Sequence, residues 1–299
     1  MDKPLATQDL IFRQDYFDDP AGWRAISDLL RDVFGVDISP LDRLGGHDRS
    51  NMPSAWFDAD GRCVANFSAF AMPLMIDGRR VEAAGLQSGA VRPDYRGRGL
   101  FRELTRITLQ RCEEVGYEAI VLYTDKPGLY LPYGFVTVPQ FRFSGPAPAA
   151  ADMDATARRL DIHQPADLAI IRAALANRIP VSNRFAVTDQ SLMFLLNAYL
   201  VEDVRLSFID DFSAVVAWRT AEDGRFELLD IAAPAIPPLA TILAALGQRP
   251  ASVTAHVPPD RLAWQATAEK DGGDLMFMMR CAPDLIPAEP FCLSPMAEF

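Results

Sequence analysis

The sequence predicts a mixed α/β protein built from two halves of similar length. Short β-rich runs alternate with amphipathic helical patterns along the chain. A run of Pro, Ala and Gly without periodicity, residues 144–152, lies near the middle. The 299 residues, 49% of them hydrophobic, are enough for two cores. We therefore expect domains at residues 1–145 and 153–299, joined by a linker.

Helices in the first half are predicted where apolar residues recur at helical spacing, and strands where β-branched and aromatic residues cluster. Residues 20–34 and 100–115 fit the helical pattern, and Gly116 is a typical C-cap of the second helix. Strands are expected at residues 9–13, 55–58, 64–76, 81–91, 118–124 and 135–143.

The strand at residues 81–91 has two features beyond its composition. Asp77-Gly78 precedes it, and this pair predicts a tight hairpin. Gly85 and Gly89 lie inside it, where glycine indicates a bulge or a close approach to the backbone.

The second half repeats the alternation of helices and strands without a comparable glycine loop. Helices are expected at residues 165–175, 190–200 and 237–246, and strands at residues 204–209, 214–219, 226–231, 252–257 and 274–280. The tail, residues 282–299, carries four prolines and is predicted to be extended.

The charge balance and the cysteines exclude several classes of protein. Lys and Arg number 29 against 40 Asp and Glu, a net charge of −11, which disfavours nucleic acid and anionic membrane and favours a cationic partner. Four scattered cysteines without C-x-x-C spacing predict free thiols in a reducing cytoplasm and no metal site. The N-terminus has no apolar signal segment, and Pro73 interrupts the longest apolar stretch, so we expect a cytoplasmic protein without a membrane span.

The most informative segment is Arg96-Gly97-Arg98-Gly99, between a predicted strand and a predicted helix. Two glycines allow a tight turn, and a helix N-terminus adds unpaired N–H donors and partial positive charge, so the segment predicts a phosphate or pyrophosphate site. The Walker pattern is absent, and Arg102 stands where a dinucleotide motif requires glycine. Coenzyme A remains as the polyanion.

These residues resemble the signature of the GNAT acetyltransferase superfamily, Q/R-x-x-G-x-G/A at the start of a helix after a strand. Arg96 and Gly99 match the pattern, whereas Phe101 stands where the family prefers Gly or Ala. In the later segment LYLPYGF, Tyr130 lies four residues before Gly134, as is common in the family. The resemblance covers about residues 9–143 and implies acetyl-CoA as cosubstrate.

A narrower resemblance is to the enhanced-intracellular-survival (Eis) type, in which an active GNAT domain is followed by a degenerate one. The strand ending at Val91, the arginine-rich loop after it and a second half without a phosphate loop all agree. The resemblance implies tandem GNAT folds, here without a sterol-carrier-like domain. It also implies a tyrosine general acid and a C-terminal carboxylate base, which map to Tyr130 and Phe299.

The resemblance also implies cofactor contacts along the strand, the loop and the helix start. These residues are Gly89, Ala90, Val91, Arg96, Gly97, Arg98, Gly99, Leu100, Phe101 and Thr124. Trp23 and Trp56 are interpreted as core residues or as walls of an amine pocket. Gln87 and Ser88 either face the substrate or only build the strand, and Arg111 is expected on a solvated helix face.

We therefore expect an acetyl-CoA-dependent N-acetyltransferase that acetylates a primary amine by direct attack in a ternary complex. The acidic balance and the family resemblance favour a basic small-molecule amine. Two alternatives stay open. One is a protein or peptide N-acetyltransferase with an open groove, and the other is a non-catalytic acyl-CoA-binding sensor, which the Phe101 departure leaves possible. Homo-oligomer formation is left open.

Overall fold

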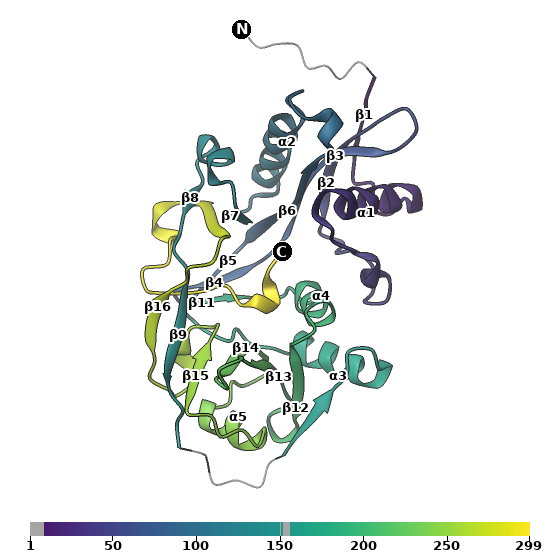
Figure 1. Ribbon diagram of the computed structural model, residues 1–299. Helices are drawn as coiled ribbons and strands as arrows, with labels where there is room; N and C mark the ends of the chain where they lie inside the picture. The colour runs from purple at the N-terminus through teal and green to yellow at the C-terminus, as the bar shows by residue number, and fades with distance from the viewer. Residues whose placement is uncertain (1–8, 150, 152–155) are drawn as a thin grey trace. The chain divides into compact units, whose positions relative to one another are not determined.

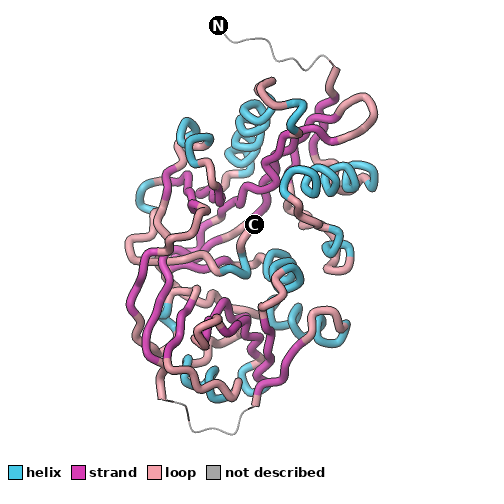
Figure 2. The backbone as a smooth tube through the Cα atoms, viewed as in Figure 1, coloured by secondary structure: helices cyan, strands magenta, loops and turns pink. Residues whose placement is uncertain are grey.

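The computed structural model describes residues 9–149, 151 and 156–299. Its helices and strands form a mixed α/β fold, as predicted (Figure 2). The described residues divide into two compact units. The first holds the described residues up to Ala71, Glu82–Leu122 and Phe299; the second holds Met72–Val81 and Tyr123–Glu298.

The first unit is a sheet flanked by two helices (Figure 1). Its strands, in spatial order, are β1 (Ile11–Gln14), β2 (Met52–Phe57), β3 (Cys63–Ala71), β6 (Ala83–Val91) and β7 (Ala119–Thr124), whose last two residues belong to the second unit. The pairing is antiparallel from β1 to β6 and parallel between β6 and β7. A parallel pair requires a crossover connection, which α2 (Leu100–Val115) provides here.

Helix α1 (Pro20–Phe34) has the bounds predicted from its periodicity. Asp19 caps it by accepting from the Ala21 N–H at 3.0 Å, and Pro20 fits the first turn, where no N–H is needed. Gly35 ends the helix with φ 69°, the left-handed value that favours glycine. Helices α1 and α2 both pack on β3, and all but the last residue of β3 is buried (Figure 1).

The second unit contains a larger sheet, a small sheet and a strand pair. The larger sheet has the order β10 (Ala157–Leu160), β12 (Arg205–Ile209), β13 (Ala214–Thr220), β14 (Phe226–Ala232), β15 (Ser252–Ala255), β9 (Phe141–Pro146) and β16 (Thr267–Lys270). The small sheet has the order β11 (Phe185–Val187), β4 (Leu74–Ile76) and β5 (Arg79–Val81), and β17 (Met276–Cys281) pairs with β8 (Val136–Thr137).

The helices of the second unit are α3 (Pro165–Ala176), α4 (Leu192–Leu200) and α5 (Leu239–Ala245). Its main apolar core gathers side chains of β13, β14, β15 and α5, with fully buried residues such as Val216, Leu228 and Ile242. Short 3-10 helices connect elements in both units: η1 (Ser39–Asp42), η2 (Pro93–Tyr95), η3 (Pro127–Leu129), η4 (Leu131–Tyr133), η5 (Asp210–Phe212), η6 (Pro259–Arg261), η7 (Pro283–Leu285) and η8 (Pro295–Ala297).

Three expectations need correction. The strand expected at residues 135–143 is divided into β8 and β9, which lie in different sheets. The strand expected at residues 64–76 is interrupted, because Pro73 cannot continue the ladder, and its second part forms the β4–β5 hairpin with the predicted Asp77-Gly78 turn. Ser144–Pro146, expected at the start of a linker, lie in β9 and pair with β15. Strands β10, β11 and β16 were not predicted, because three or four residues carry too little periodicity.

No helix in the described ranges is both long enough and apolar enough to cross a bilayer.

Candidate functional site

Strand β6 departs from regular pairing at two places. Its parallel pairing with β7 ends at Gly85–Val121 in the described part of the chain. Three residues later its register with β3 shifts, so that Ser88 and Gly89 together oppose Phe67. Ser88 has φ 57° and marks a β-bulge, which confirms the bulge predicted from the glycines. The β6 backbone beyond Gly85 has no β7 partner there, and a backbone edge of this kind can pair with an extended ligand.

The turn between β6 and α2 presents amide donors at a helix N-terminus. Gly97 and Gly99 have φ 76° and 82°, values that glycine adopts without strain. Gly99 is the N-cap of α2 and has no side chain that could bond the first amides. Arg96 and Arg98 are exposed beside this turn, and the Arg98 guanidinium lies 4.7 Å from the Tyr95 ring centroid. Outward N–H groups, the helix dipole and two guanidinium groups together suit an anion.

Other arginines of this basic stretch stabilise the fold. Arg92 is 3% exposed and pairs with Asp32. Arg111 was expected on a solvated helix face, which is wrong: its guanidinium lies 2.6 Å from the Asp15 carboxylate. An acidic partner within reach of a long side chain is not visible in the helical periodicity.

The side chain of Phe101 packs within the first unit. Its ring centroid lies 5.4 Å from that of Phe67. A Cβ on Gly89 would lie 3.0 Å from the Phe67 ring and 3.1 Å from Phe101 Cε2. The bulky residue at position 101 is therefore accommodated by glycine at the bulge.

The second unit repeats this strand arrangement without the turn. Strand β13 pairs antiparallel with β14, with a register shift at Ala217/Trp218, and β14 pairs parallel with β15. Between β14 and α5 the chain has three prolines in residues 233–238, and Pro238 is the N-cap of α5. Because proline has no N–H, this turn has few donors for a phosphate.

Tyr130 lies between η3 and η4 and is 8% exposed. Its ring packs edge-on against Phe135, with centroids 5.9 Å apart. Burial, and to a lesser extent the negative charge of Asp125, raise the pKa of Tyr130 to about 12. The phenol is therefore protonated at neutral pH and has a proton to donate.

The last residue of the chain belongs to the first unit. The Phe299 ring meets Phe70 edge-on, with centroids 5.3 Å apart at 81°, and a Cβ on Gly85 would lie 3.1 Å from Phe299 Cε2. Phe70 and Gly85 are partners in the β3–β6 ladder. The ring of Phe299 therefore lies where β6 and β7 stop pairing.

The tail before Phe299 is anchored in the second unit. The Leu293 N–H donates to Gln140 Oε1 at 2.7 Å, and the Asn197 side-chain amide donates to the Glu298 carbonyl at 2.8 Å. Phe291 is 1% exposed. The tail was predicted to be extended, but the 3-10 helices η7 and η8 interrupt it, because each begins at a proline that fits a first helical turn. Side chains fix its position up to the residue before the end.

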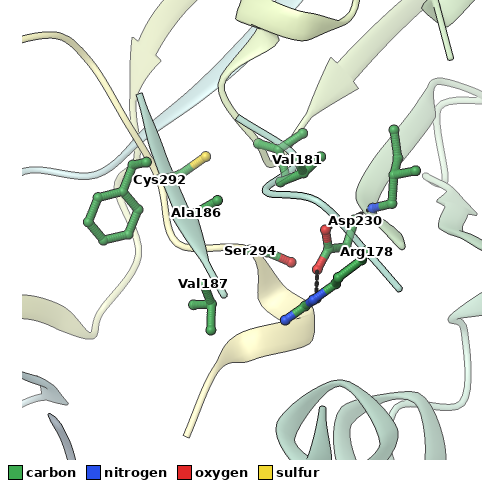
Figure 3. Close-up of a pocket in the computed structure, with 10 residues that line it drawn as sticks. Arg178, Val181, Ala186, Val187, Asp230, Cys292 and Ser294 are labelled. Carbon is green, nitrogen blue, oxygen red and sulfur yellow. Dashed lines mark hydrogen bonds and ion pairs between the residues drawn. The ribbon is translucent and has the colours of Figure 1, made fainter. Parts of the chain in front are cut away.

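A small cavity of the second unit also contacts this tail (Figure 3). Arg178 and Asp230, 3.8 Å apart, lie in its lining with Cys292 and Ser294, and Ser294 Oγ donates to the Leu229 carbonyl at 3.0 Å. Burial raises the pKa of Asp230. The cavity measures about 10 Å³, which is the room one water molecule needs. It is therefore too small for a substrate and is interpreted as part of the tail anchor.

A larger hollow in the second unit, which we call the acidic pocket, has a volume of about 380 Å³. Its lining includes Tyr123, Arg142, Asp271, Asp274 and Glu298. Arg142 Nε lies 3.4 Å from Asp271 and balances one carboxylate. Burial, and next the charge of Asp271, raise the pKa of Glu298. The size falls in the range of small-molecule sites, and the charges suit a cation.

The predicted substrate residues lie on different elements of the first unit. Gln87 and Ser88 are adjacent on β6, and the Gln87 side-chain amide donates to Asn51 Oδ1 at 2.8 Å. Trp56 lies on β2, which β3 separates from β6, and its ring centroid is 5.1 Å from that of Phe12.

Two further predicted residues make contacts that stabilise the structure. Trp23 on α1 donates from Nε1 to Asp42 at 3.2 Å, and its ring centroid lies 5.5 Å from that of His47. Thr124 Oγ1 accepts from the Lys126 N–H at 2.9 Å and shapes the turn after β7.

One cluster beside the bulge was missed in the sequence. Asn66 and Tyr16 are buried and hydrogen-bonded to each other. The signal for Asn66 is a polar amide within the apolar strand CVANFSAFA, since a buried polar group requires partners.

Comparison with known proteins agrees with this geometry. Residues 19–138 match the acetyltransferase (GNAT) domain family. An uncharacterized N-acetyltransferase of Streptomyces griseus is 38% identical over 95 residues, which are 31% of this chain and 22% of that protein. The uncharacterized N-acetyltransferase YhbS of Escherichia coli is 37% identical over 78 residues, 26% of this chain and 45% of that protein. The chain thus spans less than half the length of either relative.

Solved structures resemble most of the chain. A probable N-acyltransferase from Enterococcus faecalis has a TM-score of 0.60 at 14% identity, covering 91% of this chain and 72% of that one. Eis1 from Mycobacterium abscessus has a TM-score of 0.57 at 15% identity, covering 91% and 73%. These likenesses concern the fold, which contains two GNAT-like sheet bodies. The comparisons therefore show a GNAT acetyltransferase domain at residues 19–138 of this chain.

Proposed function

We propose that the protein is an N-acetyltransferase that moves the acetyl group of acetyl-CoA to a primary amine of a basic small molecule. One observation carries the proposal: the split, bulged strand β6 leads directly into a glycine turn and an uncapped helix N-terminus. A strand edge without a partner suits the amide-bearing arm of coenzyme A, and the turn suits its diphosphate.

Cofactor binding is assigned to residues along β6 and the start of α2. Gly97, Gly99 and the first amides of α2 would bind the diphosphate, with Arg96 and Arg98 beside it. In the second unit, the turn between β14 and α5 has few such donors because it is rich in proline. We therefore assign one cofactor site, in the first unit.

The proposed reaction is a direct transfer in a ternary complex. The amine nitrogen attacks the thioester carbonyl carbon, the C–S bond breaks, and the sulfur leaves as a thiolate. An N–H near Val91 polarises the carbonyl oxygen, and Tyr130, protonated at neutral pH, donates a proton to the thiolate. A protonated amine must first lose one proton before its nitrogen can attack, and we assign this step to the carboxylate of Phe299. The second proton, lost from the nitrogen as the amide forms, balances the one that Tyr130 gives to the thiolate. The anchored tail supports this assignment, because an ordered chain end can hold a base in position.

The charge of the acceptor is inferred from the acidic pocket. The lining of this pocket includes the carboxylates of Asp271, Asp274 and Glu298, whose negative charge suits a bound cation. Burial, and next the charge of Asp271, raise the pKa of Glu298. The net charge of −11 also attracts basic molecules.

A graded panel of amines tests this function. Release of the CoA thiol is followed for monoamines, polyamines, amino sugars and a basic peptide at equal concentration. We expect turnover with small polycationic amines. In Asp274→Asn we expect a several-fold higher KM for the amine. The matched variant Asp223→Asn, an exposed carboxylate in the turn between β13 and β14, leaves KM unchanged. Turnover with the peptide alone would favour the protein-acetylating alternative.

The sensor alternative predicts a different result. Phe101 packs against Phe67, so the residue that kept this alternative open has a structural explanation. Tight binding of acetyl-CoA by calorimetry, with no thiol release for any amine, would overturn the proposed enzyme and favour the sensor.

A further inference from the structure

A buried polar cluster lies beside the bulge of β6. Asn66 is 0% exposed, and its Nδ2 donates to the Ser88 carbonyl at 2.9 Å and to Ser68 Oγ at 3.0 Å. Its Oδ1 accepts from the Tyr16 hydroxyl at 2.8 Å. Tyr16 is also buried, and its ring packs edge-on against Phe57 with centroids 5.0 Å apart.

The partners fix the direction of the Asn66 amide. A backbone carbonyl can only accept, so Nδ2 must face Ser88, and Oδ1 then faces Tyr16, whose hydroxyl donates. A side-chain amide offers a donor and an acceptor on one planar group, which this position requires. Because the cluster is buried, losing the Tyr16 hydroxyl leaves Asn66 Oδ1 with the longer bond from Ser68 Oγ, at 3.4 Å, and such a loss in a buried site costs stability.

The bulge explains why side chains are needed here. Ser88 has φ 57°, an uncommon value for a residue with a Cβ, and the two-to-one register interrupts the ladder bonds. Asn66 bonds the Ser88 carbonyl, and Thr108 Oγ1 of α2 donates to the Phe67 carbonyl at 3.3 Å. Side chains, in addition to the neighbouring strand, therefore determine where the β6 backbone points after Ser88.

We propose that Asn66, oriented by Tyr16, is a positioning residue that fixes the peptide groups of residues 88–91 against the acetyl thioester. The inference rests on the proposed function, because these peptide groups act on the reaction only when the thioester lies along β6. We call Asn66 and Tyr16 together the brace. The brace acts at the thioester end of the coenzyme, whereas the diphosphate is assigned to the turn at residues 96–99. Loss of the brace should therefore change turnover and coenzyme binding by different amounts.

Two variants of different severity test the brace. Tyr16→Phe removes only the hydroxyl, and Asn66→Ala removes every bond of the amide. The matched control is Ser207→Ala in the second unit, which removes a buried acceptor from Trp218 Nε1 at 3.0 Å. Three quantities are measured: kcat/KM for acetyl-CoA, the Kd of CoA by calorimetry, and amide exchange of a peptide covering residues 84–92.

We expect kcat/KM to fall about 10-fold in Tyr16→Phe and about 100-fold in Asn66→Ala, the loss typical of a reacting group displaced by about 1 Å. The Kd of CoA stays at the wild-type value, and exchange at residues 86–91 becomes faster. If Asn66→Ala does not fold, Tyr16→Phe alone decides. A fall in kcat/KM no larger than that of Ser207→Ala overturns the inference, and so does a parallel loss of CoA binding.

The exchange measurement separates this inference from the proposed function. If the wild-type protein acetylates no amine, the proposed function fails. Faster exchange in both variants then still supports the brace as a determinant of the bulge. Unchanged exchange at residues 86–91 overturns the brace, whatever the activity.

Discussion

Replacing Gly85 by alanine tests the position of the Phe299 ring. A Cβ at this residue would lie 2.7 Å from Cε1 and Cζ of Phe70 and 3.1 Å from Cε2 of Phe299. Carbon atoms in contact prefer at least about 3.5 Å, so Phe70 must move by about 0.8 Å and Phe299 by about 0.4 Å. Phe70 is 0% exposed, and its ring cannot move without displacing core neighbours. We expect Gly85→Ala to lower the free energy of unfolding by about 1–3 kcal/mol.

Urea unfolding measures this loss as a lower midpoint at unchanged slope. The matched control is Gly272→Ala, because a Cβ there meets no atom within 4 Å and the backbone is not left-handed. The control should be neutral or slightly more stable, by about 0.4–1 kcal/mol. The double variant Gly85→Ala/Phe299→Leu should regain part of the loss, because a smaller end residue gives the new methyl group room. Equal midpoints for Gly85→Ala and Gly272→Ala would refute the packing described here.

Other expected outcomes concern the proposed chemistry and the second unit. Tyr130→Phe should bind acetyl-CoA normally and lose about 10²- to 10⁴-fold in kcat; because the pKa of Tyr130 is about 12, its deprotonation should not reduce wild-type turnover below about pH 10. Deleting Phe299, or extending the chain beyond it, should lower kcat and alter the pH profile, and an unchanged profile would reject the carboxylate base. Arg98→Glu should weaken CoA binding in calorimetry, and equal affinity would contradict the anion site. Glu227 has its pKa lowered to about 2, first by His256 and also by Arg219, whose Nε lies 2.6 Å away, so Glu227→Gln should lower the free energy of unfolding at pH 7 by about 1–3 kcal/mol. That cost is fully present above the unfolded pKa near 4.5 and shrinks as pH falls toward 2, so an unfolding series that shows no such decline would contradict it.

The sequence patterns predicted the elements whose bounds are set by residues within or next to the element itself. Helix α1 has its own cap and C-terminal glycine, and the split in the strand at Pro73 follows from a single residue. The turn at residues 96–99 was found because its glycines are needed for backbone conformation alone.

Contacts distant in sequence could not be predicted in the same way. The ion pair of Arg111 with Asp15 joins residues 96 positions apart, and the bond from Asn197 to the Glu298 carbonyl joins residues 101 apart. Neither leaves a periodic signal. Short strands such as β16 exist because a neighbouring strand supplies their hydrogen bonds, and their own residues do not indicate it.

The two glycines of β6 limit how a ligand can approach this strand. A Cβ on Gly85 would meet the Phe299 ring, and one on Gly89 would meet the ring of Phe101. Both glycines therefore accommodate aromatic side chains of the same chain, and these rings occupy the space directly above each glycine. A ligand that pairs with this stretch can approach along the plane of the sheet, where β7 has stopped pairing. Affinity for such a ligand would depend on the direction of the β6 peptide groups, and the buried amide of Asn66 contributes to that direction through Ser88.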